Sequence, residues 1–144
     1  IDMMNASRLL VLILGSTLAF QACAFENLVG EYIGKLSSVE GYRANVGDPC
    51  AVLVGKSDMY GGSLVFEIRD VEKLTMETRN VEKALKPKSD TVKIHTPGSS
   101  FDKPAEIVVM KLGDDGTMQS LKLMRHWGQQ HREQSVTCGD LLKK

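Results

Sequence analysis

The stretch EIVVMKLGDDGTMQSLKLMRHW, from Glu106 to Trp127, decides the fold class of this chain. Its first part is a β-rich run, and the turn formers Gly113–Gly116 follow directly. Its second part alternates between apolar and polar residues, which places Leu121 and Leu123 on the same face of an extended chain. Two such runs joined by a Gly/Asp turn are typical of an antiparallel β-hairpin.

Three other stretches have the pattern of β-strands. Ser63–Arg69 alternates most clearly, with Leu64 and Phe66 on one face, and Thr91–Thr96 alternates in the same way. Cys50–Val54 is a continuous apolar run that ends at a glycine, which is typical of a strand covered on both faces.

The segment Asp70–Lys86 supports two interpretations. Its apolar residues lie near helical spacing, and Asp70 is a suitable N-cap for a helix. Residues Lys73–Arg79 instead alternate and carry β-branched threonines, which suit a strand. We expect a strand over Lys73–Arg79, and we expect Pro87 to end the element in either case.

The remaining segments are predicted from their turn formers and polar residues. We expect loops over Ser37–Pro49, Lys56–Gly62, Pro97–Pro104 and Gln129–Gln134. A short strand over Val136–Cys138 then closes the domain.

The first strand is expected within Asn27–Leu36, where Gly30 and Gly34 flank Tyr32. A glycine in a strand allows a bend or the close approach of another backbone. This Gly-x-Tyr-x-Gly run resembles the opening strand of lipocalin-like small barrels, and no functional residue follows from the resemblance. Together the patterns predict an all-β domain of seven or eight antiparallel strands, with room for one short helix. A lipocalin-like barrel is favoured, and a sandwich is the alternative.

The N-terminal segment has the layout of a secretory signal peptide. Arg8 precedes an apolar run over Leu9–Phe20, and the small residues Ala22 and Ala24 lie at positions −3 and −1 of a cleavage site. We therefore expect a signal peptide over residues 1–24, including two residues upstream of the first methionine, and a single β domain over residues 25–144. The protein is expected to be secreted or periplasmic.

Two alternatives apply to the same segment. The apolar run is shorter than the ~20 residues that a membrane-spanning helix needs, so no integral span is expected in the mature chain. Cys23 could instead carry a lipid anchor, although Gln21 fits a lipoprotein signal poorly.

Cleavage would leave two cysteines, Cys50 and Cys138. An even number in an exported protein predicts a disulfide, and two buried free thiols are the alternative. The bond would close a loop of about 88 residues and stabilise the fold by about 4 kcal/mol.

The charges exclude two classes of partner. The chain has 18 Lys and Arg residues against 18 Asp and Glu residues, so its formal net charge is zero. Because nucleic-acid binders and anionic-membrane binders rely on a basic excess, neither partner is expected.

No catalytic or metal-binding set emerges from the reactive residue types. His95, His126 and His131 have no cysteine or carboxylate at ligand spacing and no recognisable nucleophile beside them. Asp114 and Asp115 are explained by the turn that they form. We therefore expect no cofactor, no metal and no enzymatic activity.

Aromatic residues are the candidate contact residues. Tyr42, Tyr60, Phe101 and Trp127 fall in predicted loops or at strand ends, where small β domains present binding sites. The alternative is that these rings cap the two ends of the core.

The sequence thus favours a non-enzymatic binding module for a small apolar ligand or a protein. A narrower alternative is a secreted inhibitor of a hydrolase, of the lysozyme-inhibitor type, and a small hydrolase is the least favoured. If the barrel were hollow, its ligand-binding cavity would be lined by inward residues such as Leu64, Phe66, Leu121 and Leu123.

Overall fold

The computed structural model of the chain describes residues 25–99, 102–128 and 130–144. The predicted signal peptide, residues 1–24, and the predicted contact residue Phe101 lie outside these ranges. No helix within the described ranges has the length and apolar character that crossing a membrane requires.

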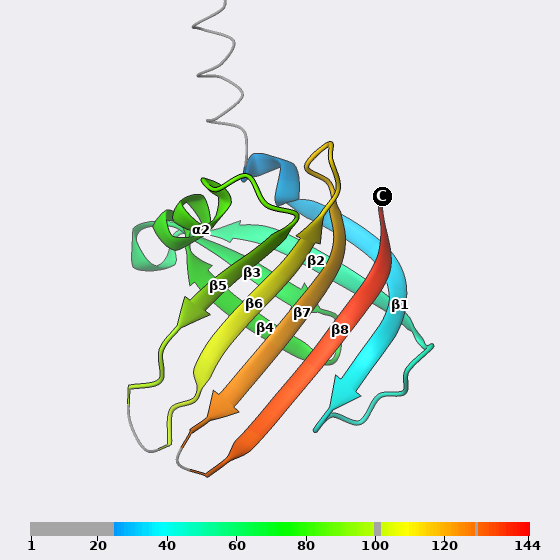
Figure 1. The fold of residues 1–144 in the computed structure, drawn as a ribbon, viewed down its shortest axis with the longest axis vertical. Helices are drawn as coiled ribbons and strands as arrows, with labels where there is room; N and C mark the ends of the chain where they lie inside the picture. The colour runs from blue at the N-terminus through cyan, green and yellow to red at the C-terminus, as the bar shows by residue number, and fades with distance from the viewer. Residues whose placement is uncertain (1–24, 100–101, 129) are drawn as a thin grey trace, which may run out of the picture.

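Eight antiparallel strands form one sheet that curls into a nearly closed barrel (Figure 1). The strands are β1 Gly30–Glu40, β2 Pro49–Ser57, β3 Ser63–Ile68, β4 Glu72–Glu77, β5 Thr91–Thr96, β6 Ala105–Leu112, β7 Met118–Trp127 and β8 Arg132–Lys143. The helical elements are η1 Glu26–Leu28, η2 Met59–Gly61 and α2 Thr78–Leu85. The strand order is β4-β3-β2-β1-β8-β7-β6-β5, which confirms the prediction of a mostly β domain with one short helix.

The barrel has a seam between β4 and β5, which stand at the two ends of the strand order. Side chains rather than backbone hydrogen bonds join the two edges. Helix α2 connects β4 to β5, packs against both and buries Val81 in the core. At the seam itself, the Thr96 hydroxyl donates a hydrogen bond to the Met76 sulfur at 3.2 Å.

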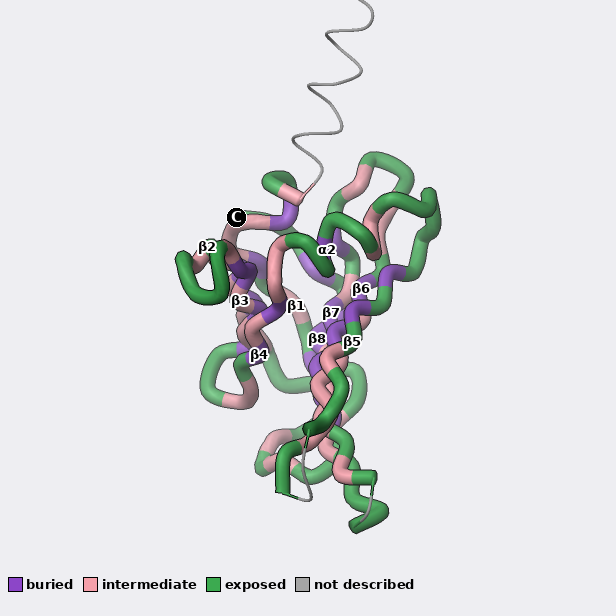
Figure 2. The backbone as a smooth tube through the Cα atoms, turned by 90° about the vertical axis from the view of Figure 1, so that its left-hand side faces the viewer, coloured by how far each residue is buried: buried purple, intermediate pink, exposed green. Residues whose placement is uncertain are grey.

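The inward side chains of the strands pack into one continuous apolar core. Leu64, Phe66, Leu121 and Leu123, which would line a hollow barrel, are fully buried members of that core. Figure 2 shows the buried positions gathered along the strands and the connecting segments exposed at both ends. The described interior is therefore filled by its own side chains.

The predicted disulfide is confirmed. Cys50 on β2 and Cys138 on β8 are bonded, and their Cα atoms are 6.1 Å apart although β1 lies between the two strands. Gly34 of β1 lies at this point, and a Cβ placed there would be 2.2 Å from the carbonyl oxygen of Gly139. The glycine therefore permits the close approach of β8, as expected from the sequence.

The prediction of a strand over Lys73–Arg79 is wrong at its end. Strand β4 stops at Glu77, and α2 begins at Thr78. The alternation belongs to β4, and only the second half of the segment is helical. The N-cap of α2 is Glu77, so the interpretation with Asp70 as the cap is wrong. The helix ends just before Pro87, which cannot continue it.

Three predicted loops are shorter in the structure. Strand β2 continues to Ser57, into the predicted loop Lys56–Gly62, and η2 forms within the rest of that loop. Strand β8 begins at Arg132, so the predicted loop Gln129–Gln134 and the short strand Val136–Cys138 are both corrected. Strand β1 likewise extends to Glu40, into the predicted loop from Ser37. A bulge in the pairing of β1 with β8 near Ser37 breaks the alternation that would have marked the strand.

Candidate functional site

The inward row of side chains on β7 continues beyond the apolar core. Leu121 and Leu123 are buried in the core, and Arg125 and Trp127 follow on the same face because strand residues alternate. The row therefore changes from apolar to charged and then to aromatic towards the end of the barrel where β7 turns into β8.

Residues of the neighbouring strand β8 lie directly opposite the outer residues of this row. Arg125 pairs with Gln134 of β8, and Trp127 pairs with Arg132. The Gln134 amide donates a hydrogen bond to the Gly41 carbonyl at 3.1 Å, which ties β8 to the segment that follows β1.

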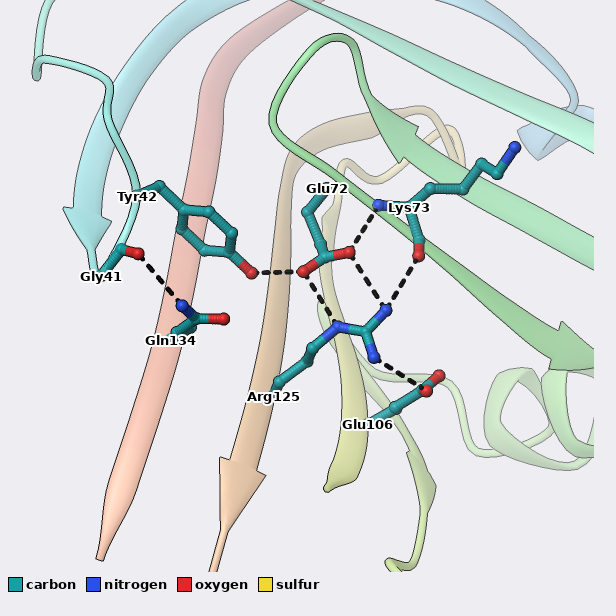
Figure 3. Close-up of polar contacts among 7 residues, drawn as sticks. All are labelled: Gly41, Tyr42, Glu72, Lys73, Glu106, Arg125 and Gln134. Carbon is teal, nitrogen blue, oxygen red and sulfur yellow. Dashed lines mark hydrogen bonds and ion pairs between the residues drawn. The ribbon is translucent and has the colours of Figure 1, made fainter. Parts of the chain in front are cut away.

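Four residues from different elements form the Arg125 cluster at this end (Figure 3). The cluster comprises Arg125 of β7, Glu72 at the start of β4, Glu106 of β6 and Tyr42 in the β1–β2 connection. The Arg125 guanidinium donates to both Glu72 oxygens, from Nε at 2.9 Å and from Nη2 at 3.1 Å. Nη1 donates to Glu106 at 3.3 Å, and the Tyr42 hydroxyl donates to Glu72 Oε2 at 2.5 Å.

The charges of the cluster stabilise one another. Burial by itself raises the pKa of Glu72, but hydrogen bonds from Arg125, Tyr42 and the Lys73 backbone together hold it below its ordinary value. Burial and the adjacent carboxylate raise the pKa of the Tyr42 hydroxyl. The hydrogen bonds to Glu72 raise the pKa of Arg125. At neutral pH, Glu72 is therefore a charged acceptor and Tyr42 a neutral donor.

The Arg125 cluster also holds the barrel together. Arg125 Nη2 reaches the Lys73 carbonyl at 3.4 Å, in addition to the bidentate contact with Glu72. These bonds join β7 to β4, two strands that are not neighbours in the sheet. The cluster thus closes the polar end of the core with side chains.

The Trp127–Arg132 pair lies two residues beyond Arg125, towards the β7–β8 turn. The guanidinium carbon of Arg132 is 4.7 Å from the centroid of the Trp127 ring, within the range of a cation–π interaction. Trp127 is half-buried and Arg132 is exposed. Trp127 is the last residue of β7 and Arg132 the first of β8, so the pair lies where the two hydrogen-bonded strands end.

The predicted contact residues do not form a single site. Tyr42 and Trp127 lie at the same end of the barrel, where Tyr42 packs against the core and supports Glu72. Tyr60 lies in η2 between β2 and β3, at the opposite end, and it is exposed with a left-handed backbone at φ 56°. Of the three predicted contact residues that the structure describes, Tyr42 and Trp127 therefore lie at one end of the barrel and Tyr60 at the other.

The three histidines do not belong to the Arg125 cluster. His95 is exposed on β5, and His126 Nδ1 is 3.9 Å from Glu133 Oε2 on β8. His131 lies in the β7–β8 turn with φ 49°. Within the described ranges, no three His, Cys, Asp or Glu side chains are grouped so that they could hold a metal ion.

The sequence interpretation missed Arg125, Glu72, Glu106 and Arg132. The available signal was the phase of the strand, because Arg125 lies at the next inward position after Leu121 and Leu123. A charged residue at an inward position needs a partner of opposite charge. Which acid would meet it depends on the curl of the sheet, which the local pattern does not contain.

Comparisons with protein families, with characterised proteins and with solved structures found no match to this chain.

Proposed function

We propose that the protein is an exported, non-enzymatic binding module that recognises a protein partner with the end of the barrel where Trp127 and Arg132 lie. The observation that carries the proposal is the Trp127–Arg132 pair itself, held at 4.7 Å on two adjacent strands. Trp, Tyr and Arg are the residue types most enriched among those that dominate protein–protein binding energy.

The filled interior supports a protein partner over an interior ligand. The inward residues that would surround a small apolar molecule pack against one another in the core. A ligand entering there would have to displace well-packed side chains, which is costly. Contacts at the surface require no such displacement.

The disulfide supports the export part of the proposal. A bond between Cys50 and Cys138 fits an oxidising compartment such as the periplasm or the extracellular space. Removal of residues 1–24 as a signal peptide belongs to the same proposal, and the N-terminus of exported protein should then be Phe25.

The test uses the disulfide-bonded protein as bait in secreted or periplasmic extract, followed by direct titration of each purified candidate. Trp127→Ala should weaken binding by about 30-fold or more, the effect of losing an interface residue that contributes about 2 kcal/mol. Tyr60→Asn is the matched control, because it removes an exposed aromatic at the opposite end and Asn tolerates the left-handed backbone.

Three outcomes would contradict the proposal. The first is a partner whose affinity does not change with Trp127→Ala. The second is stoichiometric binding of an apolar dye inside the barrel. The third is turnover of a hydrolase substrate that disappears when His95, His126 or His131 is replaced. If the partner is itself a hydrolase, its residual activity in the complex decides whether the module inhibits it.

A further inference from the structure

The outer face of the sheet carries a second feature, far from the inward row that contains Trp127. Ile33 of β1 and Leu142 of β8 are directly paired across the two strands, and both point away from the core. Their exposed fractions are 46% and 70%, which are high values for large aliphatic side chains. They lie in an open hollow of about 810 Å³, which Pro49, Ala51 and Val71 also line.

Opposite charges flank this apolar centre along each strand. On β1, Glu31 and Lys35 lie two residues before and two residues after Ile33, so the three side chains share the outer face. Asp140 of β8 and Lys144, the residue directly after β8, lie two residues to either side of Leu142, and both line the hollow.

Because β1 and β8 run in opposite directions, the charged residues that flank Ile33 and Leu142 form two groups, one on each side of the apolar centre. Lys144 lies beside Glu31, because its backbone N–H donates to the Glu31 carbonyl at 2.9 Å. Arg69 is on the same side, at 3.5 Å from the Glu31 carboxylate, so this side has a net charge of +1. The other side of the hollow carries Lys35, Asp70 and Asp140, for a net charge of −1.

We propose that this face is where two copies of the chain associate, about a twofold axis that lies in the interface and runs across the strands at the level of Ile33 and Leu142. Such an axis brings each apolar residue onto its own counterpart. It also places Glu31 of one copy opposite Lys35 of the other, and Asp140 opposite Lys144. The surface is thus complementary to itself, as a twofold interface requires.

Charge supports a second copy over other occupants. The rim is neutral as a whole, so it offers no attraction to a polyanion or to an anionic membrane. The charges around the hollow instead attract a partner that carries the same charges in the reverse order along each strand. A second copy of this chain supplies that order.

The first test is the oligomeric state of the disulfide-bonded mature protein, measured by sedimentation equilibrium from about 5 µM to about 500 µM, the range in which small interfaces dissociate. We expect a monomer–dimer equilibrium that Ile33→Glu abolishes. Val46→Glu is the matched control, because Val46 is an exposed aliphatic residue in the β1–β2 connection, outside the hollow. That variant should dimerise like the wild type.

A charge reversal tests the predicted axis. Lys35→Glu places two acids opposite each other at both symmetry-related contacts, so it should weaken the dimer about tenfold or more. Glu31 also pairs with Arg69 at 3.5 Å and with Lys144 at 3.3 Å in its own chain, so a lysine at this position would add a third cation. Adding Glu31→Gln to Lys35→Glu removes the repulsion between the two acids without that cation and should recover part of the affinity. Circular dichroism of each variant checks that the barrel is folded.

A wild-type protein that is monomeric over the whole range would overturn the proposal. So would a dimer that tolerates Ile33→Glu, or a Glu31→Gln/Lys35→Glu double variant that binds no better than Lys35→Glu alone. The proposal is independent of the proposed function, because Trp127→Ala alters the opposite face and should leave the dimer unchanged.

Discussion

Replacing Glu72 with Gln tests whether the Arg125 cluster holds the barrel closed. The substitution keeps the shape of the side chain and removes the charge that Arg125 contacts with two nitrogens. Arg125 would then retain one ion pair, with Glu106 at 3.3 Å, and its hydrogen bond to the Lys73 carbonyl at 3.4 Å. We expect Glu72→Gln to lower the free energy of unfolding without changing the fold.

The expected loss follows from the burial of the pair. Side-chain exposure is 12% for Glu72 and 26% for Arg125, so the pair lies between a surface and a fully buried ion pair. Exposed pairs contribute about 0.2–1 kcal/mol, and removing one partner of a buried pair costs about 3–5 kcal/mol. We therefore expect a loss of about 1.5–3 kcal/mol at neutral pH. The predicted domain, residues 25–144, has 120 residues, for which 1 kcal/mol shifts the melting temperature by about 4 °C.

The loss should depend on pH in a defined direction. The pKa of Glu72 in the folded protein lies below its ordinary value of 4.5. Its stabilising contribution is therefore fully present above that value, and it disappears as the pH falls through the lowered pKa. The difference in free energy of unfolding between wild type and Glu72→Gln should be constant from about pH 6 to 7 and should shrink as the pH falls below about 4.5.

Urea titrations followed by circular dichroism over this pH range provide the measurement. Glu106→Gln is the matched control, because it removes the weaker of the two carboxylates from Arg125 and should cost less than about 1 kcal/mol. Equal stability of Glu72→Gln and wild type at neutral pH would refute the reasoning. A loss that does not change with pH would show that the charge of Glu72 is not what stabilises the closed barrel.

Two further predictions concern the point where β2, β1 and β8 meet. Reduction of the Cys50–Cys138 bond should lower the free energy of unfolding by about 4 kcal/mol in urea titrations, and a change below about 1 kcal/mol would contradict the loop-closure argument. Gly34→Ala should cost about 2 kcal/mol or more, because its Cβ would meet the Gly139 carbonyl oxygen, whereas Gly55→Ala, with open space around it, should raise stability by up to about 1 kcal/mol. Equal effects of the two glycine substitutions would exclude the close approach at Gly34.

The sequence predicted the parts of the fold in which local pattern and tertiary environment agree. The strands over Ser63–Ile68 and Thr91–Thr96 have one face in the core and one face outside, so their alternation is visible in the chain. The first half of β8 lies beside the Arg125 cluster, where inward positions such as Gln134 are polar. Its pattern therefore predicted a loop.

The candidate site was predictable only in part, for a similar reason. Trp127 and Tyr42 could be proposed from residue type and position alone. Their assignment to one end, and that of Tyr60 to the other, depends on which connections share an end of the barrel. Glu72 and Arg125 are 53 residues apart, and they meet only because the sheet curls until β4 faces β7.

A bulge in β8 explains why one strand contributes to both proposed surfaces. Between the pairs Ile33–Leu142 and Lys35–Gly139, β8 has one residue more than β1. With strict alternation from the buried Cys138, Leu142 would point into the core. The extra residue shifts the phase, so that Leu141 is buried and Leu142 is exposed. The left-handed backbone of Asp140, at φ 52°, lies in this bulge and orients the acid that we place opposite Lys144 of the second copy. Deleting Asp140 would remove the extra residue and restore strict alternation with Leu141 still inward and Leu142 still outward. The shortened strand should therefore keep the apolar centre of the dimer surface and lose only the carboxylate that we place opposite Lys144.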